Sequence, residues 1–218
     1  DKLRAFLTRN YFIMALTQFE IVQPTLFKAA AEQLRARLPD PSLFIEVPTQ
    51  PILGDLDELN RLGKIIWVPR MVIPPYCDYD YHHPVRFVVY YRTKMLGYVF
   101  GGYNENRQAL EVHYMEKVRD AHEDFLKKFL PLVIEVLAAY ACFIKQQGLG
   151  VDRIALVNPT SNRQDYYAGS GFELHGNYDG FCHAMVLSAS LETNSFVFAS
   201  LYKKKPAKGL VLLRNPAF

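Results

Sequence analysis

The sequence has few cysteines, and their placement argues against two common ways of stabilising a small domain. Only three occur among the 218 residues, Cys77, Cys142 and Cys182, and they are far apart. Their number is odd and no CxxC pair is present, so neither a disulfide framework nor a zinc ribbon is indicated. We therefore predict a reducing compartment, the cytoplasm. Cys142 falls in an apolar helical pattern and is expected to pack in the core.

An excess of charge of one sign is also missing. The net charge is +3 and charged residues make up 22% of the chain, so we predict no nucleic-acid partner and no wholesale disorder. The apolar stretch near the start, Tyr11 to Leu16, is far shorter than the ~20 residues of a membrane-spanning helix, and we predict no membrane span. Because the sequence begins with Asp1 and not with Met, signals that precede it cannot be read.

Hydrophobic and aromatic residues, in contrast, are plentiful. Half of the residues are hydrophobic, which is enough for one sizeable core, and we predict a single domain over 1–218. The 14 Tyr and 15 Phe fit a well-packed core with Tyr hydroxyl groups at its rim. A pocket for an elongated ligand would use the same residues.

The first eighty residues are predicted to be mainly helical. Pro24 and Thr25 suit a helix start, and Gly63 suits a helix end. The predicted elements are helices at 2–16, 25–38 and 55–62, an extended segment at 43–51 and a strand at 64–73.

The segment 74–84 is an aromatic and acidic loop whose side chains could be drawn as metal ligands. These are Asp78, Asp80, His82 and His83. Their spacing matches no paired ligand pattern of known sites, so we favour a surface loop and predict no metal.

The rest of the chain has an α/β pattern. Short polar turns separate three strand patterns that form a meander, and a long apolar helix then ends at Gly148. Pro131 either begins this helix or kinks it. The predicted elements are strands at 86–91, 96–103 and 109–118, a helix within 125–147, a strand at 153–157, a short helix at 164–168, and strands at 183–190 and 195–202.

The stretch VLAAYACFIKQQGLGVDRIALV, followed by NRQDYYAGSGFEL, resembles the second half of the GNAT-type N-acyltransferases. In that family an amphipathic helix ends at a glycine and a buried strand follows. A short helix then carries a Tyr shortly before a Gly-Phe pair. The matching positions here are Gly148, Arg153 to Val157, Tyr167, Gly171 and Phe172.

The resemblance covers 86–202, whereas 1–80 is a divergent part with an N-terminal helical extension. It implies a GNAT-like α/β fold with a mixed, mostly antiparallel central sheet flanked by helices. It also implies transfer of an acyl group from acetyl-CoA or a longer acyl-CoA to an amine of a small molecule or a protein. The residues that choose the acceptor, and the oligomeric state, cannot be read.

One part of the family pattern is missing. The family binds the coenzyme A pyrophosphate with a glycine-rich turn at a helix start, but no glycine occurs between Gly102 and Gly148. One placement of this turn, 119–124, keeps an Arg and adds three carboxylates. We prefer the other, at Lys127 and Lys128, because cations there attract phosphate and the spacing to Gly148 is right.

The resemblance also implies which residues act. It places a base on or near the fourth strand, where Glu111 and His113 stand two residues apart on one face, with Glu116 opposite if the strand is regular. Alternatively, Glu111 and His113 form a solvent-exposed face. Tyr167 matches the family Tyr near the thioester sulfur, or only packs its helix. Further coenzyme contacts are expected at Val112, Asn158, Asn162 and Tyr166.

Two other functions remain open. Without the glycine turn, a GNAT-like fold could be an inactive binding or scaffold module, or could accept its acyl group from an acyl-carrier protein. A weaker alternative is a metal enzyme that uses histidines, drawn from His82, His83, His113 and His122.

Overall fold

The computed structural model describes residues 18–72 and 83–188. The predicted helix at 2–16 and the predicted strand at 195–202 lie outside these residues, as do Asp78, Asp80 and His82. His83 belongs to a strand and not to the preceding loop, and its Nε2 lies 3.1 Å from Oε1 of Glu105.

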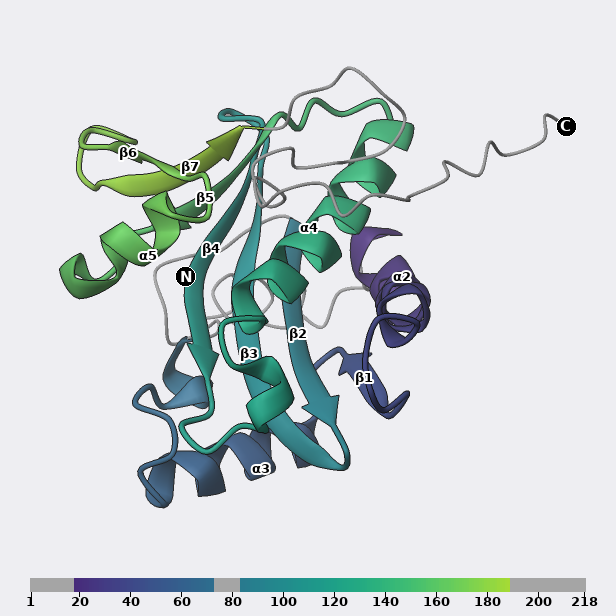
Figure 1. The fold of residues 1–218 in the computed structure, drawn as a ribbon. Helices are drawn as coiled ribbons and strands as arrows, with labels where there is room; N and C mark the ends of the chain where they lie inside the picture. Colours follow the sequence, from purple (N-terminus) through teal and green to yellow (C-terminus); the bar gives the residue numbers. More distant parts are fainter. Residues whose placement is uncertain (1–17, 73–82, 189–218) are drawn as a thin grey trace, which may run out of the picture.

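A seven-stranded sheet organises the described residues (Figure 1). Its order is β1-β2-β3-β4-β5-β7-β6, and every neighbouring pair is antiparallel except β4 and β5. The strands are β1 Leu43–Glu46, β2 His83–Tyr91, β3 Lys94–Asn104, β4 Ala109–Lys117, β5 Arg153–Val157, β6 Glu173–His175 and β7 Ala184–Ser188.

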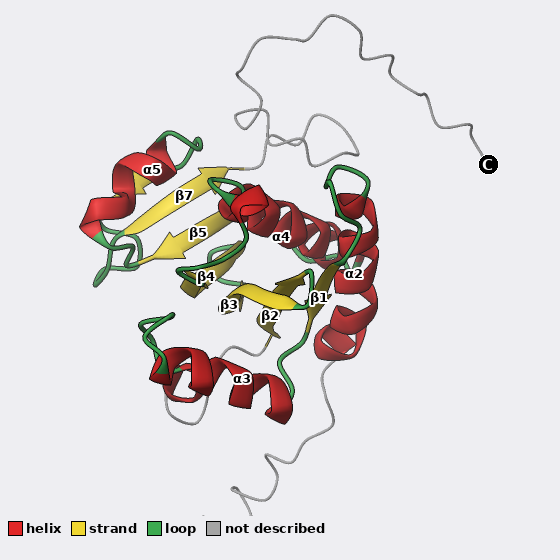
Figure 2. Cartoon of the chain, turned by 60° about the horizontal axis from the view of Figure 1, so that its bottom comes forward, coloured by secondary structure: helices red, strands yellow, loops and turns green. Residues whose placement is uncertain are grey.

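Helices cover both faces of this sheet. Figure 2 shows α2 and α4 on one face and α3 on the other. The short helix α5 follows β5 and contacts β6 and β7. Their bounds are α2 Gln18–Arg35, α3 Gln50–Arg61, α4 Phe129–Gln146 and α5 Gln164–Ala168. The result is an α/β fold with a mixed, mostly antiparallel central sheet flanked by helices, as expected from the resemblance.

The two faces bury different clusters because side chains alternate along each strand. Phe87, Val99 and Ile154 lie in the large core with residues of α2 and α4. On the opposite face, Tyr98 and Phe100 pack with apolar residues of α3. The central strands β2 and β3 are therefore largely buried on both sides.

The helix α4 is apolar enough, by length and composition, to cross a membrane, with a mean hydropathy of 1.6. Its surroundings are those of a core helix, since 61% of it is buried within the structure. Pro131 lies in its first turn, where a missing N–H costs nothing, so the helix is not kinked there. Gly148, with a φ of +81°, follows its end as predicted.

Three sequence predictions about local structure are wrong. The helix predicted at 25–38 begins at Gln18 and contains Pro24. The side chain of the preceding Gln23 is only 2% exposed and donates to the carbonyl of Pro84, so tertiary packing carries the helix across the proline.

The strand predicted at 64–73 is a series of bends and a short 3-10 helix, Pro69–Val72. No neighbouring strand pairs with it; the N–H groups of Ile66 and Trp67 donate instead to the carboxylate of Glu116. The strand β6 was not predicted, because it has three residues and all of them are exposed.

A bulge interrupts β4. Phe100 pairs with Tyr114 and Gly101 pairs with Val112, so His113 is an extra residue without an opposite partner in β3. Val112 lies in the core under α4, whereas Tyr114 packs on the α3 side. The strand is therefore irregular, and Glu116 lies on the same face as Glu111 rather than opposite it.

Gly101 makes this bulge sterically feasible. A Cβ at this position would lie 1.9 Å from the carbonyl oxygen of Glu111, which is a backbone atom and cannot swing away. Only glycine permits β3 and β4 to approach this closely.

We expect Gly101→Ala to lower the free energy of unfolding by about 1–3 kcal/mol, the usual cost of overpacking. Gly54→Ala is the matched control, because a Cβ there meets nothing within 4 Å and alanine favours the helix. Urea denaturation of both variants measures the effect. A Gly101→Ala protein as stable as the parent would contradict this account of the bulge.

Candidate functional site

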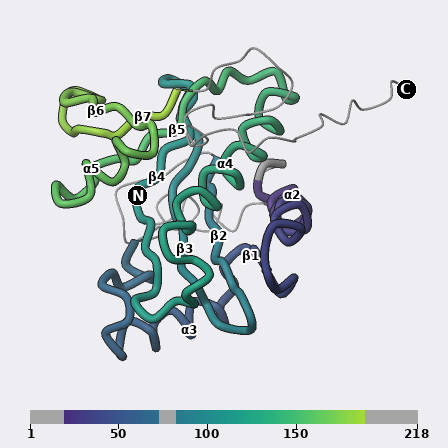
Figure 3. The backbone as a smooth tube through the Cα atoms, in the orientation of Figure 1, coloured from purple at the N-terminus to yellow at the C-terminus, as the bar shows by residue number. Residues whose placement is uncertain are grey.

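The parallel strands β4 and β5 stop pairing halfway along β4. Their pairing runs from Ala109 and Arg153 to Val112 and Leu156, and β5 then ends at Val157. β4 continues to Lys117, so β5 offers no partner to its backbone groups over 113–117. Figure 3 traces the chain as it turns from β5 toward α5 and from β4 toward α4. We call the region where this backbone pairing ends the β4–β5 opening.

The turn after β5 is fixed on its other side. Asn158 has a φ of +49°, and its N–H donates to the carbonyl of His183 at 2.9 Å. The loop between β6 and β7 therefore sits beside the opening. Asn162 lies in the following 3-10 helix, Ser161–Arg163, and both asparagines are exposed.

The carboxylate of Glu111 is buried next to this opening and only 4% of the residue is exposed. It accepts hydrogen bonds from Asn104, from Nη1 of Arg107 at 3.1 Å and from the hydroxyl of Tyr178 at 3.0 Å. Burial, followed by the charge of Glu111, raises the pKa of Tyr178, so this hydroxyl stays protonated and donates. The alternative of a solvent-exposed Glu111 is wrong.

His113 begins the part of β4 that no longer pairs with β5, and its side chain is also buried. Its Nε2 lies 3.6 Å from Oε2 of Glu111. The structure therefore brings the two predicted residues together, with the carboxylate placed to stabilise a positive charge on the imidazole. The sequence does not reveal Arg107 and Tyr178 as partners, because they come from a turn and a loop that only the fold brings to β4.

An aromatic wall lies further along the same face of β4. Trp67, 48% exposed, packs edge-on against Tyr114 with ring centroids 5.3 Å apart. Glu116 holds this arrangement, because its carboxylate accepts the N–H groups of Ile66 and Trp67 and the hydroxyl of Tyr98. Sequence reasoning did not single out Trp67, although it is the only tryptophan in the chain.

Tyr167 lies on α5, the short helix that follows β5. Its ring packs against that core and against Phe172, with centroids 6.2 Å apart. Gly171, with a φ of +92°, turns the chain so that the N–H of Phe172 donates to the carbonyl of Tyr167. Burial raises the pKa of the Tyr167 hydroxyl, while the charge of Arg163 opposes this weakly. The group is therefore protonated at neutral pH. The neighbouring Tyr166 is 38% exposed.

The start of α4 carries both predicted cations. Lys127 has a φ of +61°, a conformation that favours glycine, and Lys128 directly precedes the helix. The first helical hydrogen bond runs from the N–H of Leu132 to the carbonyl of Lys128, which leaves the N–H groups of Phe129 and Leu130 without a helical partner. Both lysines are exposed, so this helix start can receive an anion.

Gly97 allows the first residue of α4 to lie close to β3. A Cβ there would lie 2.5 Å from the ring of Phe129, the first residue of the helix, which is buried on β3. The absence of this side chain lets the helix start lie close to the sheet.

The other placement of the phosphate turn, 119–124, has two of its three acidic groups engaged with the protein. Asp120 pairs with Lys64 at 2.7 Å. Asp124 accepts a hydrogen bond from the hydroxyl of Tyr91 at 2.8 Å and lies 3.7 Å from Arg92. These contacts fasten the segment before α4 to β2 and to the loop after α3.

Within residues 18–72 and 83–188, no group of three or more His, Cys, Asp or Glu side chains is placed to hold a metal ion. His113 and His122 lie in separate surroundings, since His122 contacts Arg92 and Asp124.

Comparisons with known proteins find only distant structural similarities. No family model and no curated protein sequence matches the chain. Among solved structures it is similar to the spermidine/spermine N-acetyltransferase SpeG of Vibrio cholerae, with 17% identity over 68% of this chain and 95% of that one and a TM-score of 0.43. An aminoglycoside N-acetyltransferase has 15% identity over 67% and 96% of the two chains and a TM-score of 0.46.

A third structure, the PaiA N-acetyltransferase of Thermoplasma acidophilum, is in complex with coenzyme A. It has 14% identity over 66% of this chain and 98% of that one, with a TM-score of 0.43. At these identities the similarity concerns the fold alone.

The β6–β7 loop contains Cys182, and the pKa of its thiol depends on the charge nearby. Burial and then the carboxylate of Asp179 raise the pKa of Cys182 to about 11. At pH 8 this thiol should carry roughly a hundredfold less thiolate than one with an ordinary pKa of 9.0, and it should react slowly with iodoacetamide.

Asp179→Asn keeps an oxygen that can accept the N–H groups of Phe181 and Cys182 but removes the charge. We expect the alkylation rate of Cys182 at pH 8 to rise severalfold because the thiol pKa falls, as measured by site-resolved mass spectrometry. Cys142, near Lys145, is the internal control and should not change. An unchanged Cys182 rate would contradict the assigned electrostatics.

Proposed function

We propose that this protein is an N-acyltransferase that moves an acyl group from an acyl-CoA thioester to an amine. The observation that carries the proposal is the β4–β5 opening. It begins at the bulged His113, beside the buried Glu111, and is followed on the β5 side by Tyr167. A base on β4 and an acid on the helix that follows β5 would thereby be available at one opening, as acyl transfer to an amine requires.

The donor is proposed to lie along the opening. The pantetheine arm carries amide groups, and the backbone of β4 beyond Val112 can hydrogen-bond to them much as a neighbouring strand would. Asn158, Asn162 and Tyr166 would contact the arm from the β5 side. The acyl group, acetyl or longer, would then point toward His113.

The start of α4 is proposed to hold the phosphates. Two exposed lysine ammonium groups and the N–H groups of Phe129 and Leu130 supply positive charge and donors there. The left-handed backbone of Lys127 takes the place of a glycine in the family turn. These features fit a pyrophosphate without a glycine-rich loop.

In the chemical step the amine nitrogen forms a bond to the acyl carbon while the carbon–sulfur bond breaks. His113 takes the proton that the amine loses, and Glu111 stabilises the imidazolium that results. Tyr167, kept protonated by burial, gives its proton to the leaving sulfur. The acceptor is proposed to be an amine of a small molecule or a protein that reaches the opening beside Trp67 and Tyr114.

A second candidate function is a GNAT-like binding module, or an acyltransferase supplied by an acyl-carrier protein. The observation in its favour is the segment before α4, which side-chain contacts from Lys64, Tyr91 and Arg92 fasten where the family has a glycine turn. The exposed Leu126, Lys127 and Lys128 would then meet the acidic surface of a carrier protein.

The proposal is tested by following release of the coenzyme A thiol from acetyl-CoA and longer acyl-CoAs, with polyamines, amino acids, aminoglycosides and peptide N-termini as acceptors. With an accepted amine, Tyr167→Phe should lower kcat by about 10²–10⁴-fold, the usual contribution of a general acid. The KM for the donor should change little, because the ring remains.

Tyr166→Phe is the matched control, since it removes a neighbouring hydroxyl from the same helix, and it should retain turnover. Unchanged turnover in Tyr167→Phe would rule out its hydroxyl as the acid. Absence of amine-dependent thiol release with every donor would favour the binding module.

A further inference from the structure

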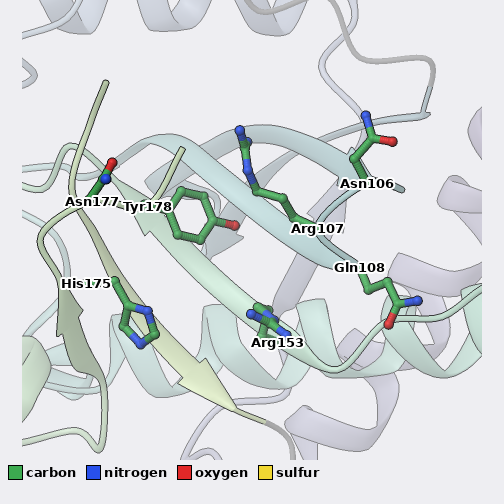
Figure 4. A pocket seen from close by; sticks show the side chains of 7 residues that line it. All are labelled: Asn106, Arg107, Gln108, Arg153, His175, Asn177 and Tyr178. Carbon is green, nitrogen blue, oxygen red and sulfur yellow. The ribbon is translucent and has the colours of Figure 1, made fainter. Parts of the chain in front are cut away.

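A polar pocket lies beside the paired part of β4 and β5, and it shares the β6–β7 loop with the β4–β5 opening. Its volume is about 330 Å³, within the range of small-molecule sites. It is formed by the turn between β3 and β4, the first residue of β5, and the end of β6 with the loop that follows. Figure 4 shows Tyr178 between Arg107 and Arg153, with Asn106 and Gln108 to one side and His175 to the other.

The side chains that line this pocket are rich in hydrogen-bond donors and include no carboxylate. They comprise two guanidinium groups, an imidazole, three carboxamides and a phenol. An acceptor-rich, negatively charged ligand suits such a lining better than a cation or an apolar molecule does.

The acidic partners of the two arginines lie outside the lining and occupy only part of each guanidinium. Nη1 of Arg107 donates to Glu111, and Nε and Nη2 of Arg153 donate to Asp152. Nε and Nη2 of Arg107 and Nη1 of Arg153 have no partner among the described residues. A guanidinium carries five N–H donors, so each arginine can hold a second acceptor while keeping its first.

The pocket is preformed. The guanidinium of Arg107 stacks on the ring of Tyr178 at 5.1 Å from its centroid. Gln108 is held with a φ of +49°, and its carbonyl accepts the N–H of Asp152 at 2.9 Å. A Cβ at Gly150 would lie 2.8 Å from the Gln108 carboxamide, so the turn and the start of β5 fit closely. Because the cations are already positioned, a ligand would order few side chains on binding.

We propose that this pocket binds a small anion that carries a carboxylate or phosphate group, with Arg107 and Arg153 holding its charged oxygens. The site is separate from the β4–β5 opening and does not depend on the acyltransferase proposal. The two sites are connected through Arg107. An anion bound to this guanidinium would share it with Glu111, whose carboxylate lies next to His113.

The test is calorimetric titration of the full chain with inorganic phosphate and, separately, with succinate, at constant ionic strength. We expect saturable binding of at least one probe with a Kd of about 1 mM or tighter. Tighter binding of phosphate indicates a phosphorylated ligand, and tighter binding of succinate indicates a carboxylic acid. Arg153→Gln should weaken the binding at least tenfold, because it removes one of the two cations.

Arg61→Gln is the matched control. Arg61 is likewise paired with a nearby carboxylate, that of Glu58, but lies on α3 away from the pocket, so its loss should leave binding unchanged. If Arg153→Gln does not fold, Asn177→Ala, at an exposed lining position, should weaken binding severalfold.

Absence of saturable binding of both probes would overturn the proposal, as would a folded Arg153→Gln protein that binds as the parent does. Coenzyme A should bind equally well to Arg153→Gln and to the parent. This measurement therefore separates a failure of the anion-site proposal from a failure of the acyltransferase proposal.

Discussion

The irregular pairing of β4 is the constraint on which the site depends. One extra residue, His113, is accommodated between the pairs Gly101–Val112 and Phe100–Tyr114, and the missing side chain of Gly101 lets the backbone of β4 approach β3. Beyond this bulge β4 leaves β5, and the strand turns Tyr114 and Glu116 toward α3. β5 ends at Val157, one residue past its last pair with β4, so the strand beyond the bulge has no partner on that side. The proposed donor site and the aromatic wall therefore lie on the same irregular part of β4.

Burial of the Glu111 carboxylate is the main electrostatic feature next to that bulge. A carboxylate out of water requires partners, and Arg107, Asn104 and Tyr178 provide them from the β3–β4 turn and the β6–β7 loop. These contacts tie both loops to the middle of the sheet. The same contacts connect the opening, which begins halfway along β4, with the polar pocket at the β3–β4 turn.

Much of the fold was predictable from the sequence, because the meander, the helix ending at Gly148, the strand 153–157 and the helix 164–168 carry strong local patterns. The Tyr167–Gly171–Phe172 spacing was a usable signal for the same reason: a left-handed glycine and a buried aromatic ring leave a visible pattern. The bulge at His113, the burial of Glu111 and the role of Trp67 were not predictable, since each depends on contacts between segments distant in sequence. The helix that contains Pro24 was not predictable for a similar reason. Tertiary packing of Gln23 carries the helix across Pro24, although the local sequence indicates a helix start there. The cytoplasmic location and the single domain over 1–218 stay predictions.

The account is tested most directly by mapping coenzyme A onto the protein with amide NMR shifts. Binding at the β4–β5 opening should perturb residues 113–117, 127–130 and 158–167, and Lys128→Ala should weaken the affinity about tenfold while Lys28→Ala, an exposed lysine on α2, leaves it unchanged. Shifts confined to 106–108 and 175–178, or no shifts at about 1 mM ligand, would contradict the assignment of the opening as the donor site.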